Sequence, residues 1–297
     1  MDVHAKIVAV GAEGSYRVRI VRRENEMARK SKSSEADALD QAQELIYQAW
    51  DARTAKRRIA LAEKALTVSA LCADAYVLLA EHTEGGSDAA LDLWRRGEEA
   101  GRTALGAAAF KEDEGDFWGL LETRPFMRAL FGLACTEKVR GDHAAAIDHL
   151  REMLRLNPND NQGARHILAA VLLEAGRDDD LAALFETYPE DSAAAWSWTR
   201  PLAAFRRSGD DAQNRKLLAK AMAGNPHVPA FLTGEKSIPA RLSPYYTPGD
   251  ANEAIEYVLD FRPGWEKTPG AIDWLRAHAS APKKAPRRNP SGRSNPQ

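Results

Sequence analysis

The sequence of 297 residues has no apolar run approaching the roughly 18 to 20 residues that a membrane-spanning helix needs. Its N-terminus also lacks the basic-then-apolar pattern of an export signal. The only cysteines, Cys72 and Cys135, each stand within an apolar helical pattern, which indicates buried, reduced thiols rather than a disulfide framework. These absences favour a cytoplasmic protein that makes no membrane contact.

The common catalytic and nucleotide-binding motifs are absent as well. The sequence contains no H-E-x-x-H, G-x-S-x-G, G-x-x-x-x-G-K-[ST] or G-x-G-x-x-G. His143 and His149 are six residues apart, whereas a spacing of four would align two metal ligands on one helix. We therefore predict a protein that is not an enzyme and that holds neither a metal ion nor a cofactor.

The net charge of −2 hides an uneven distribution along the chain. Residues 281–297 carry +5, residues 1–35 carry +3, and residues 36–280 carry −10. An acidic body argues against a nucleic-acid groove as the main function. One alternative is a nucleic-acid accessory protein that uses the tail 281–297, although short basic tails are usually solvated and disordered.

Both ends of the chain predict little packed structure. The first residues alternate weakly around GAEGS, as a marginal β-hairpin would. Alternatively, Met27 is the natural start and residues 1–26 are an upstream extension. We expect residues 1–35 to be an N-terminal extension, either a weak hairpin or disordered. Residues 281–297 have proline, serine, glycine and basic residues but nothing to bury, which predicts a disordered basic tail.

Residues 36–227 show apolar residues at helical spacing in successive pairs of segments. In the clearest pair, FMRALFGLACTEKVRGDHAAAIDHLREMLRLNPND, the two segments meet at Gly141, and Pro158 stops the second. This pair resembles the tetratricopeptide repeat, a 34-residue unit of two antiparallel helices. Glu137 departs from the family pattern, which usually has an aromatic residue there. Further, weaker pairs are expected over 36–70, 73–105, 162–188 and 195–226.

Residues 228–280 depart from the repeat pattern. The proline- and aromatic-rich sequence HVPAFLTGEKSIPARLSPYYTPGD predicts an ordered irregular segment, and helices are expected after Asp250 and after Pro269. A stack of helical pairs exposes a terminal apolar face that requires a cap. The bulky residues expected to pack there are Tyr245, Tyr246, Tyr257, Phe261, Trp265 and Trp274.

The predicted fold class is therefore all-α: a tetratricopeptide-like, right-handed solenoid of helical pairs with an irregular, aromatic-rich C-terminal cap. A further resemblance concerns roughly residues 122–227. The sequence ETRPFMRALFGLACTEKVRGDHAAAIDHLREMLRLNPNDNQGARHILAAVLLEAGRDDDL resembles the repeat region of the suppressor of tumorigenicity seven family and of bacterial tetratricopeptide proteins. SPYYTPGDANEAIEYV and WEKTPGAIDWLR are similar to the ending of those bacterial proteins. The resemblance brings no catalytic residues with it.

The polar stretch 157–166 raises the question of a catalytic or metal site. Its first residues lie where one helical pair should end and the next begin, and Asn and Asp suit such a joint. Either Asp160 or Asn161 is expected to cap the following helix. The alternative hypothesis is an enzyme whose site is assembled across the repeats from His166 and the acids 178–180. For these acids, the dipole at a helix N-terminus is the simpler explanation.

The predicted function is a protein–protein interaction scaffold that binds a peptide or helix, because stacked repeats expose a concave groove. The repeat register gives the groove candidates Arg128, Phe131, Cys135, Lys138, His166, Trp196, Thr199, Arg206 and Arg207. This mixture of cations and aromatics favours an acidic or aromatic-bearing partner segment.

Overall fold

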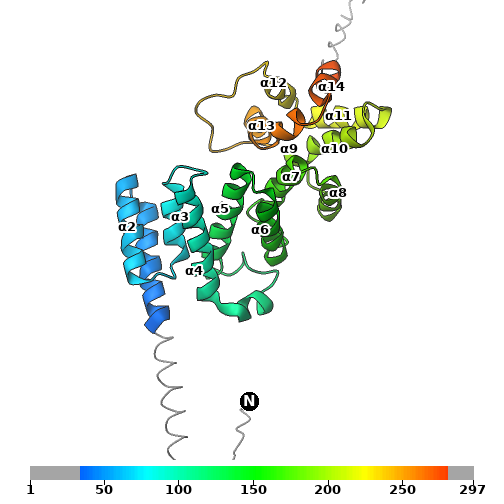
Figure 1. Cartoon of the computed structure of the whole chain (residues 1–297). Coiled ribbons are helices and arrows are strands. Elements are labelled where there is room, and N and C mark those ends of the chain that lie inside the picture. Colours follow the sequence, from blue (N-terminus) through cyan, green and yellow to red (C-terminus); the bar gives the residue numbers. More distant parts are fainter. Residues whose placement is uncertain (1–33, 280–297) are drawn as a thin grey trace, which may run out of the picture. The chain divides into compact units, whose positions relative to one another are not determined.

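The computed structural model describes residues 34–279, so the N-terminal hairpin or extension and the basic tail lie outside the described residues. Every regular element in this range is an α-helix, which confirms the all-α class (Figure 1). The chain divides into two compact units. We call their described parts the N-terminal unit, residues 34–162, and the C-terminal unit, residues 163–279.

The N-terminal unit is a succession of helices in which each contacts the next. They are the helix over residues 34–51, α2 (Ala55–Val68), α3 (Ala73–Glu81), α4 (Asp88–Glu112), α5 (Arg124–Arg140) and α6 (His143–Leu156). Contacts join α2 to α3, α3 to α4, α4 to α5 and α5 to α6, and α3 also lies against α5. The helices therefore pack in chain order, and α3 and α5, on either side of α4 in the sequence, are also in direct contact.

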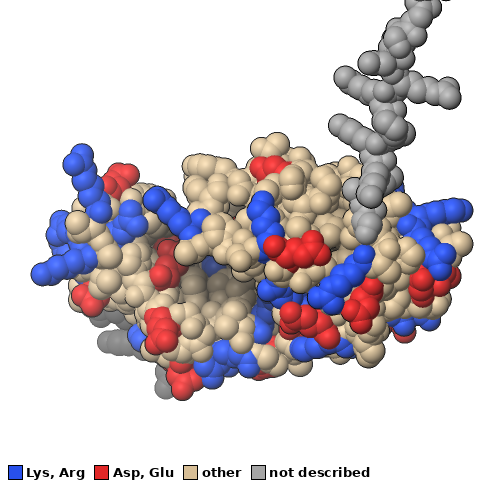
Figure 2. All heavy atoms as spheres, turned by 90° about the horizontal axis from the view of Figure 1, so that it is seen from above, with Lys and Arg blue, Asp and Glu red and all other residues tan. Residues whose placement is uncertain are grey.

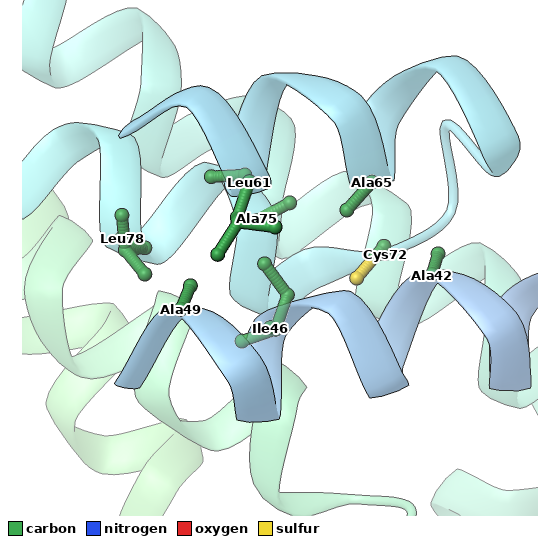
Figure 3. Close-up of a cluster of buried hydrophobic side chains, with 9 residues drawn as sticks. Ala42, Ile46, Ala49, Leu61, Ala65, Cys72, Ala75 and Leu78 are labelled. Atoms are coloured by element: carbon green, nitrogen blue, oxygen red, sulfur yellow. The ribbon is translucent and has the colours of Figure 1, made fainter. Parts of the chain in front are cut away.

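Small and aliphatic side chains form the first part of this unit's core. Figure 3 shows helix 34–51, α2 and α3 meeting through Ala42, Ile46, Ala49, Leu61, Ala65, Cys72, Ala75 and Leu78. Alanine at several of these positions lets the helices approach closely. Cys72 is fully buried, as predicted, and burial raises the pKa of its thiol to about 11. Cys72 is therefore a core residue.

Two glycines on α4 allow a second close approach. A Cβ atom at Gly101 would lie 2.9 Å from the Cβ of Phe126 and 3.0 Å from its Cα. One turn earlier, a Cβ at Gly97 would lie 3.2 Å from the Cβ of Tyr76 and 3.3 Å from that of Ala129. Because residues four apart share a helix face, one face of α4 is shaped to receive α3 and α5.

The joint predicted after α6 lies where it was expected, between α6 and α7 (Ala164–Glu174). Asn157 ends α6 and is buried, and Asp160 is buried with a φ of 50°, in the left-handed region that aspartate tolerates. The N-cap position of α7, however, is occupied by Gly163 and by neither of the predicted residues, Asp160 and Asn161.

The C-terminal unit holds shorter helices. They are α7, α8 (Asp178–Thr187), α9 (Ala194–Ser197), α10 (Thr199–Ser208), α11 (Ala212–Gly224), α12 (Val228–Leu232), α13 (Ala251–Glu266) and α14 (Ala271–His278). α7 contacts α8, α10 contacts α11, and α13 packs against α7, α9 and α12. Tryptophans from α9 and α13, among them Trp196 and Trp265, are fully buried in this core.

The six aromatic residues predicted to pack in 228–280 divide into two groups. Tyr257, Phe261, Trp265 and Trp274 are buried, as the prediction of packed aromatics required. Tyr245 is 81% exposed and Tyr246 is 53% exposed, so the prediction is wrong for these two. Both belong to the irregular segment between α12 and α13, which leaves their side chains in solvent.

Candidate binding pocket

A cavity of about 280 Å³ lies in the N-terminal unit. Its residues come from helix 34–51, from residues 71–73 at the start of α3, from α4, and from residues 121–128, which lead into α5 and form its first turns: Leu39, Asp40, Gln43, Tyr47, Leu71, Ala73, Gly101, Ala104, Leu121, Glu122, Pro125 and Arg128. Two large apolar members remain open to solvent, Tyr47 at 50% and Leu121 at 71% exposure. Exposed apolar surface beside a cavity is typical of a binding site.

Helix 34–51 supplies one wall of the cavity because its two faces differ. Leu39, Gln43 and Tyr47 follow one another at four-residue spacing and therefore share a face. Ala42 and Ile46, offset along the same helix, are fully buried against α2 and α3. The core thus fixes the helix, while the adjoining face lines the cavity.

Small residues on α4 leave the space open. Gly101 and Ala104 are three residues apart on α4, so both point toward the same side of the helix. A larger side chain at Ala104, which is exposed, would project into the cavity. The volume of the cavity therefore depends on the small side chain at Ala104.

A buried ion pair holds the cavity's polar end. Asp74 on α3 is fully buried, and its carboxylate accepts two hydrogen bonds from Arg128, Nε to Oδ1 at 2.8 Å and Nη2 to Oδ2 at 2.6 Å. Gln43 donates from Nε2 to Oδ2 of the same carboxylate at 2.9 Å. This bidentate geometry is the strong form of an arginine–carboxylate pair. It joins helix 34–51, α3 and α5 at one point.

Arg128 was predicted to line a groove, and it does lie at the cavity, with its side chain 30% exposed. Its guanidinium also lies 5.3 Å from the ring centre of Trp50, which covers it from helix 34–51. Because Asp74 accepts both hydrogen bonds of this guanidinium, the positive charge of Arg128 is already offset within the protein. Asp74 was missed in the sequence, although a lone acid within the apolar run LCADAYVLLA signals a buried carboxylate that needs a cationic partner.

The other groove candidates on α5 follow Arg128 along one face. Phe131, Cys135 and Lys138 continue from it at spacings of three, four and three residues, and all three are partly buried. The structure thus places four candidates of the N-terminal unit on one helix face, with Arg128 at the cavity.

Two candidates in the C-terminal unit do not line a surface. Trp196 and Thr199 are fully buried. The Trp196 indole donates to the carbonyl of Tyr188 at 2.9 Å, and its ring contacts Phe185 edge to face. For these two positions the groove prediction is wrong, because the helix faces that carry them turn into the core.

His166 has an acidic partner, but a different one from the acids 178–180. Its Nε2 lies 2.8 Å from Oδ2 of Asp191, and Arg165 Nε donates to the same oxygen at 2.7 Å. Burial opposes ionisation of Asp191, yet the hydrogen bonds from His166, the Ala193 N–H and Arg165 hold the pKa of its carboxyl well below its usual range. This cluster ties α7 to the turn after α8.

Arg206 and Arg207 border two further cavities in the C-terminal unit. Arg206 Nε lies 3.1 Å from a carboxylate oxygen of Asp178, and its Nη1 donates to the carbonyl of Leu173 at 2.9 Å. Arg206 and Asp178 line a cavity of about 450 Å³, and Arg207 lines another of about 250 Å³. Asp178, with the two acids after it, occupies the first turn of α8, where the helix dipole favours negative charge.

The distribution of charged and apolar side chains bears on three other kinds of site: a basic surface, a metal site and a membrane span. On the face seen in Figure 2, Lys and Arg side chains are interspersed with Asp and Glu rather than gathered into one basic surface. Between residues 34 and 279, no group of three or more His, Cys, Asp or Glu side chains is arranged to hold a metal ion. Within the same range, no helix is both long enough and apolar enough to cross a membrane.

The fold and the cavity together define an all-helical protein with a small, partly apolar pocket framed by a buried ion pair. A family model described as "ST7 protein" matches residues 30–108, which include helix 34–51, α3 and most of α4. This match lies outside the stretch 122–227 on which the sequence resemblance rested. It covers three of the pocket's four contributing segments.

Two similar proteins agree with this match. The chain is 26% identical over 270 residues to "Protein ST7 homolog" of Caenorhabditis elegans, covering 78% of this chain and 49% of that protein. It is 26% identical over 270 residues to "Suppressor of tumorigenicity 7 protein-like" of Homo sapiens, covering 82% of this chain and 46% of that protein. The chain thus spans about half the length of the curated relatives it matches.

Proposed function

We propose that the protein is an interaction scaffold in which helical pairs of the tetratricopeptide type hold a pocket for a segment of a partner protein. The pairs α3/α4 and α5/α6 each pack together, and α3 contacts α5, as the first helices of adjacent repeats would. A left-handed glycine, Gly141, makes the turn between α5 and α6. These features support a repeat arrangement.

The observation that carries the proposal is the pocket beside Tyr47 and Leu121. Its volume of about 280 Å³ lies at the lower end of the range of ligand cavities, which suits one or two side chains of a peptide. The network of Asp74, Arg128 and Gln43 fixes three of its contributing segments before any partner arrives. Such preorganisation lowers the entropic cost of binding.

The sequence predicted an acidic partner because several of the groove candidates are cations. Two of these cations, however, already have a carboxylate partner within the protein. Arg128 is bound to Asp74, and Arg206 is bound to Asp178. A cation that already has an internal carboxylate partner contributes little attraction toward a second acid. The partner's chemistry therefore has to be argued from the other residues around the pocket.

The test uses peptides selected from an unbiased random library against the full chain. Their dissociation constants are then measured by calorimetry for wild type, for Ala104→Trp, which fills the pocket, and for Ala89→Trp, which adds the same ring elsewhere on α4. Both alanines are exposed. Ala104→Trp should weaken binding at least tenfold, because the anchor side chain can no longer enter, and Ala89→Trp should bind like wild type.

Equal dissociation constants for the two tryptophan variants would place the binding site elsewhere and overturn the proposal. A library that yields no peptide with a measurable dissociation constant would do the same. Circular dichroism of both variants serves as the control for folding.

A further inference from the structure

We infer that the segment bound in this pocket is basic: an amphipathic peptide or helix that inserts an apolar anchor side chain and flanks it with Lys or Arg. The inference rests on the proposed function, since it names the partner chemistry of the same pocket. It reverses the acidic preference that the sequence had suggested.

The first support is the charge on the pocket's rim. Asp40 on helix 34–51 and Glu122 before α5 both line the pocket and are exposed. Neither has an ion-pair partner among the described residues. The remaining charged lining residue, Arg128, is offset by the fully buried Asp74. The rim therefore presents two uncompensated carboxylates, from two different segments, around an apolar interior.

The second support is the charge of the whole N-terminal unit. Residues 34–162 contain 23 acidic and 15 basic side chains, a net charge of −8, so most of the chain's acidic excess lies in the unit that holds the pocket. A negative potential over a unit steers cationic partners toward it and raises their association rate. An acidic segment would meet repulsion both at a distance and at the rim.

The third support is the apolar part of the pocket, which calls for an anchor side chain. Leu39, Leu71 and Pro125 line the cavity, and Tyr47 and Leu121 extend the apolar surface outward. An aliphatic or aromatic side chain desolvated in such a site supplies most of the binding free energy of a peptide. A purely cationic ligand would leave this surface uncovered.

The experiment compares two synthetic amphipathic peptides of equal length that share one apolar face. One carries Lys and Arg at its polar positions and the other carries Glu. Dissociation constants are measured by fluorescence anisotropy with the full chain at low and at high ionic strength. The proteins are wild type, Asp40→Lys/Glu122→Lys, and the matched control Glu44→Lys/Glu99→Lys, which reverses two exposed acids on helix 34–51 and α4 that do not line the pocket.

The basic peptide should bind wild type at least about tenfold more tightly than the acidic one, and added salt should reduce that ratio. Asp40→Lys/Glu122→Lys should bring the ratio to about one or invert it, whereas Glu44→Lys/Glu99→Lys should lower it much less. A preference for the acidic peptide, or a ratio that both double variants change equally, overturns the inference.

Ala104→Trp separates the failure of this inference from the failure of the proposed function. If the acidic peptide is preferred and Ala104→Trp abolishes its binding, the pocket binds partners but its charge preference is the opposite of the one inferred. If neither peptide's binding responds to Ala104→Trp, the proposed function itself fails. Sedimentation analysis of the chain alone tests whether a second copy of this chain occupies the pocket. Self-association that Ala104→Trp abolishes would identify a second copy as the ligand and would contradict the inference of a basic partner segment.

Discussion

At the scale of single residues, the buried carboxylate of Asp74 decides what Arg128 does. On the sequence alone, Arg128 is an exposed cation available to a partner. In the structure it makes two hydrogen bonds to a carboxylate that has no access to water. A surface charge contributes little to folding, whereas breaking a buried pair leaves an uncompensated charge in the interior. The same residue therefore belongs first to the framework of the pocket.

We predict that Arg128→Met lowers the free energy of unfolding by about 3 kcal/mol, because it leaves Asp74 buried without its partner. Replacing both partners, as in Asp74→Asn/Arg128→Met, should recover part of that loss. Arg207→Met, at an exposed arginine for which no ion pair is found in the described part of the chain, should change stability by less than about 0.5 kcal/mol. Urea unfolding followed by circular dichroism measures all three, and equal stabilities for Arg128→Met and Arg207→Met would contradict the assignment.

Asp160 allows a second test at this scale, because its φ of 50° favours glycine over alanine. Asp160→Ala and Asp160→Gly both remove the side chain's contacts, but only alanine has a Cβ that strains the left-handed backbone. We expect the glycine variant to be the more stable of the two, by up to about 1 kcal/mol. At the adjacent Asn159, which has no positive φ, the order should reverse. Thermal melts of the four variants would refute the backbone argument if alanine were the better residue at both positions.

At the scale of helices, the sequence correctly predicted the helix ends and turns that depend on the backbone preferences of single residues. The turn at Gly141 and the end of a helix before Pro158 follow from the backbone preferences of these residues, and both are found in the structure. The N-cap position of α7 was assigned to the wrong residue, because Gly163, with a φ of 75°, stands there in place of Asp160 or Asn161. Likewise, nothing local to Tyr245 and Tyr246 shows that they stay exposed while Tyr257 is buried, since that depends on which segment reaches the core.

Helix–helix contacts also explain a departure that the repeat pattern left open. Glu137 stands where the tetratricopeptide family prefers an aromatic residue, and here it is buried with an oxygen 2.8 Å from Nδ1 of His149 on α6. This contact joins α5 to α6. Because His149 carries a charge only when it is protonated, the strength of the contact should depend on pH.

The hydrogen bond to Glu137 raises the pKa of His149 above its ordinary value of about 6.5, against the opposing effect of partial burial. Because the folded state binds this proton more tightly, the stabilisation is fully present below about pH 6.5 and is lost as the pH rises through the raised pKa. His149→Gln should therefore cost more stability at about pH 5.5 than at about pH 8.5. His227→Gln, at an exposed histidine, serves as the control. A cost for His149→Gln that does not change with pH would rule out the charged pair.

The close contact of α4 with α5 at Gly101 can be tested through the stability of a substituted protein. Gly101→Ala places a Cβ at 3.0 Å from the Cα of Phe126, so backbone must move, and we expect a loss of about 1–3 kcal/mol. Gly224→Ala, in α11 with no atom near the added Cβ, should instead be neutral or slightly stabilising through helix propensity. Urea unfolding compares the two, and a Gly101→Ala protein as stable as wild type would contradict the close approach.

At the scale of the whole molecule, the sequence predicted one groove running along all the repeats, whereas its nine candidate residues fall into two compact units. Four lie on α5, and five lie beyond residue 163, where Trp196 and Thr199 are core residues. Helical periodicity identifies which residues share a face but not which neighbour covers that face. The pocket escaped prediction for this reason, since it combines Tyr47, Ala104 and Leu121 from segments far apart in the sequence.

Hydrogen–deuterium exchange of the full chain, with and without the tightest peptide from an unbiased library, tests the pocket most directly. Amide exchange reports where a ligand reduces local opening without requiring any substitution. We expect protection to rise in helix 34–51, in α4 around residues 101–104 and in residues 121–128, and residues 163–279 to exchange as before. Protection confined to residues 163–279, or to the ends outside 34–279, would contradict a binding pocket in the N-terminal unit.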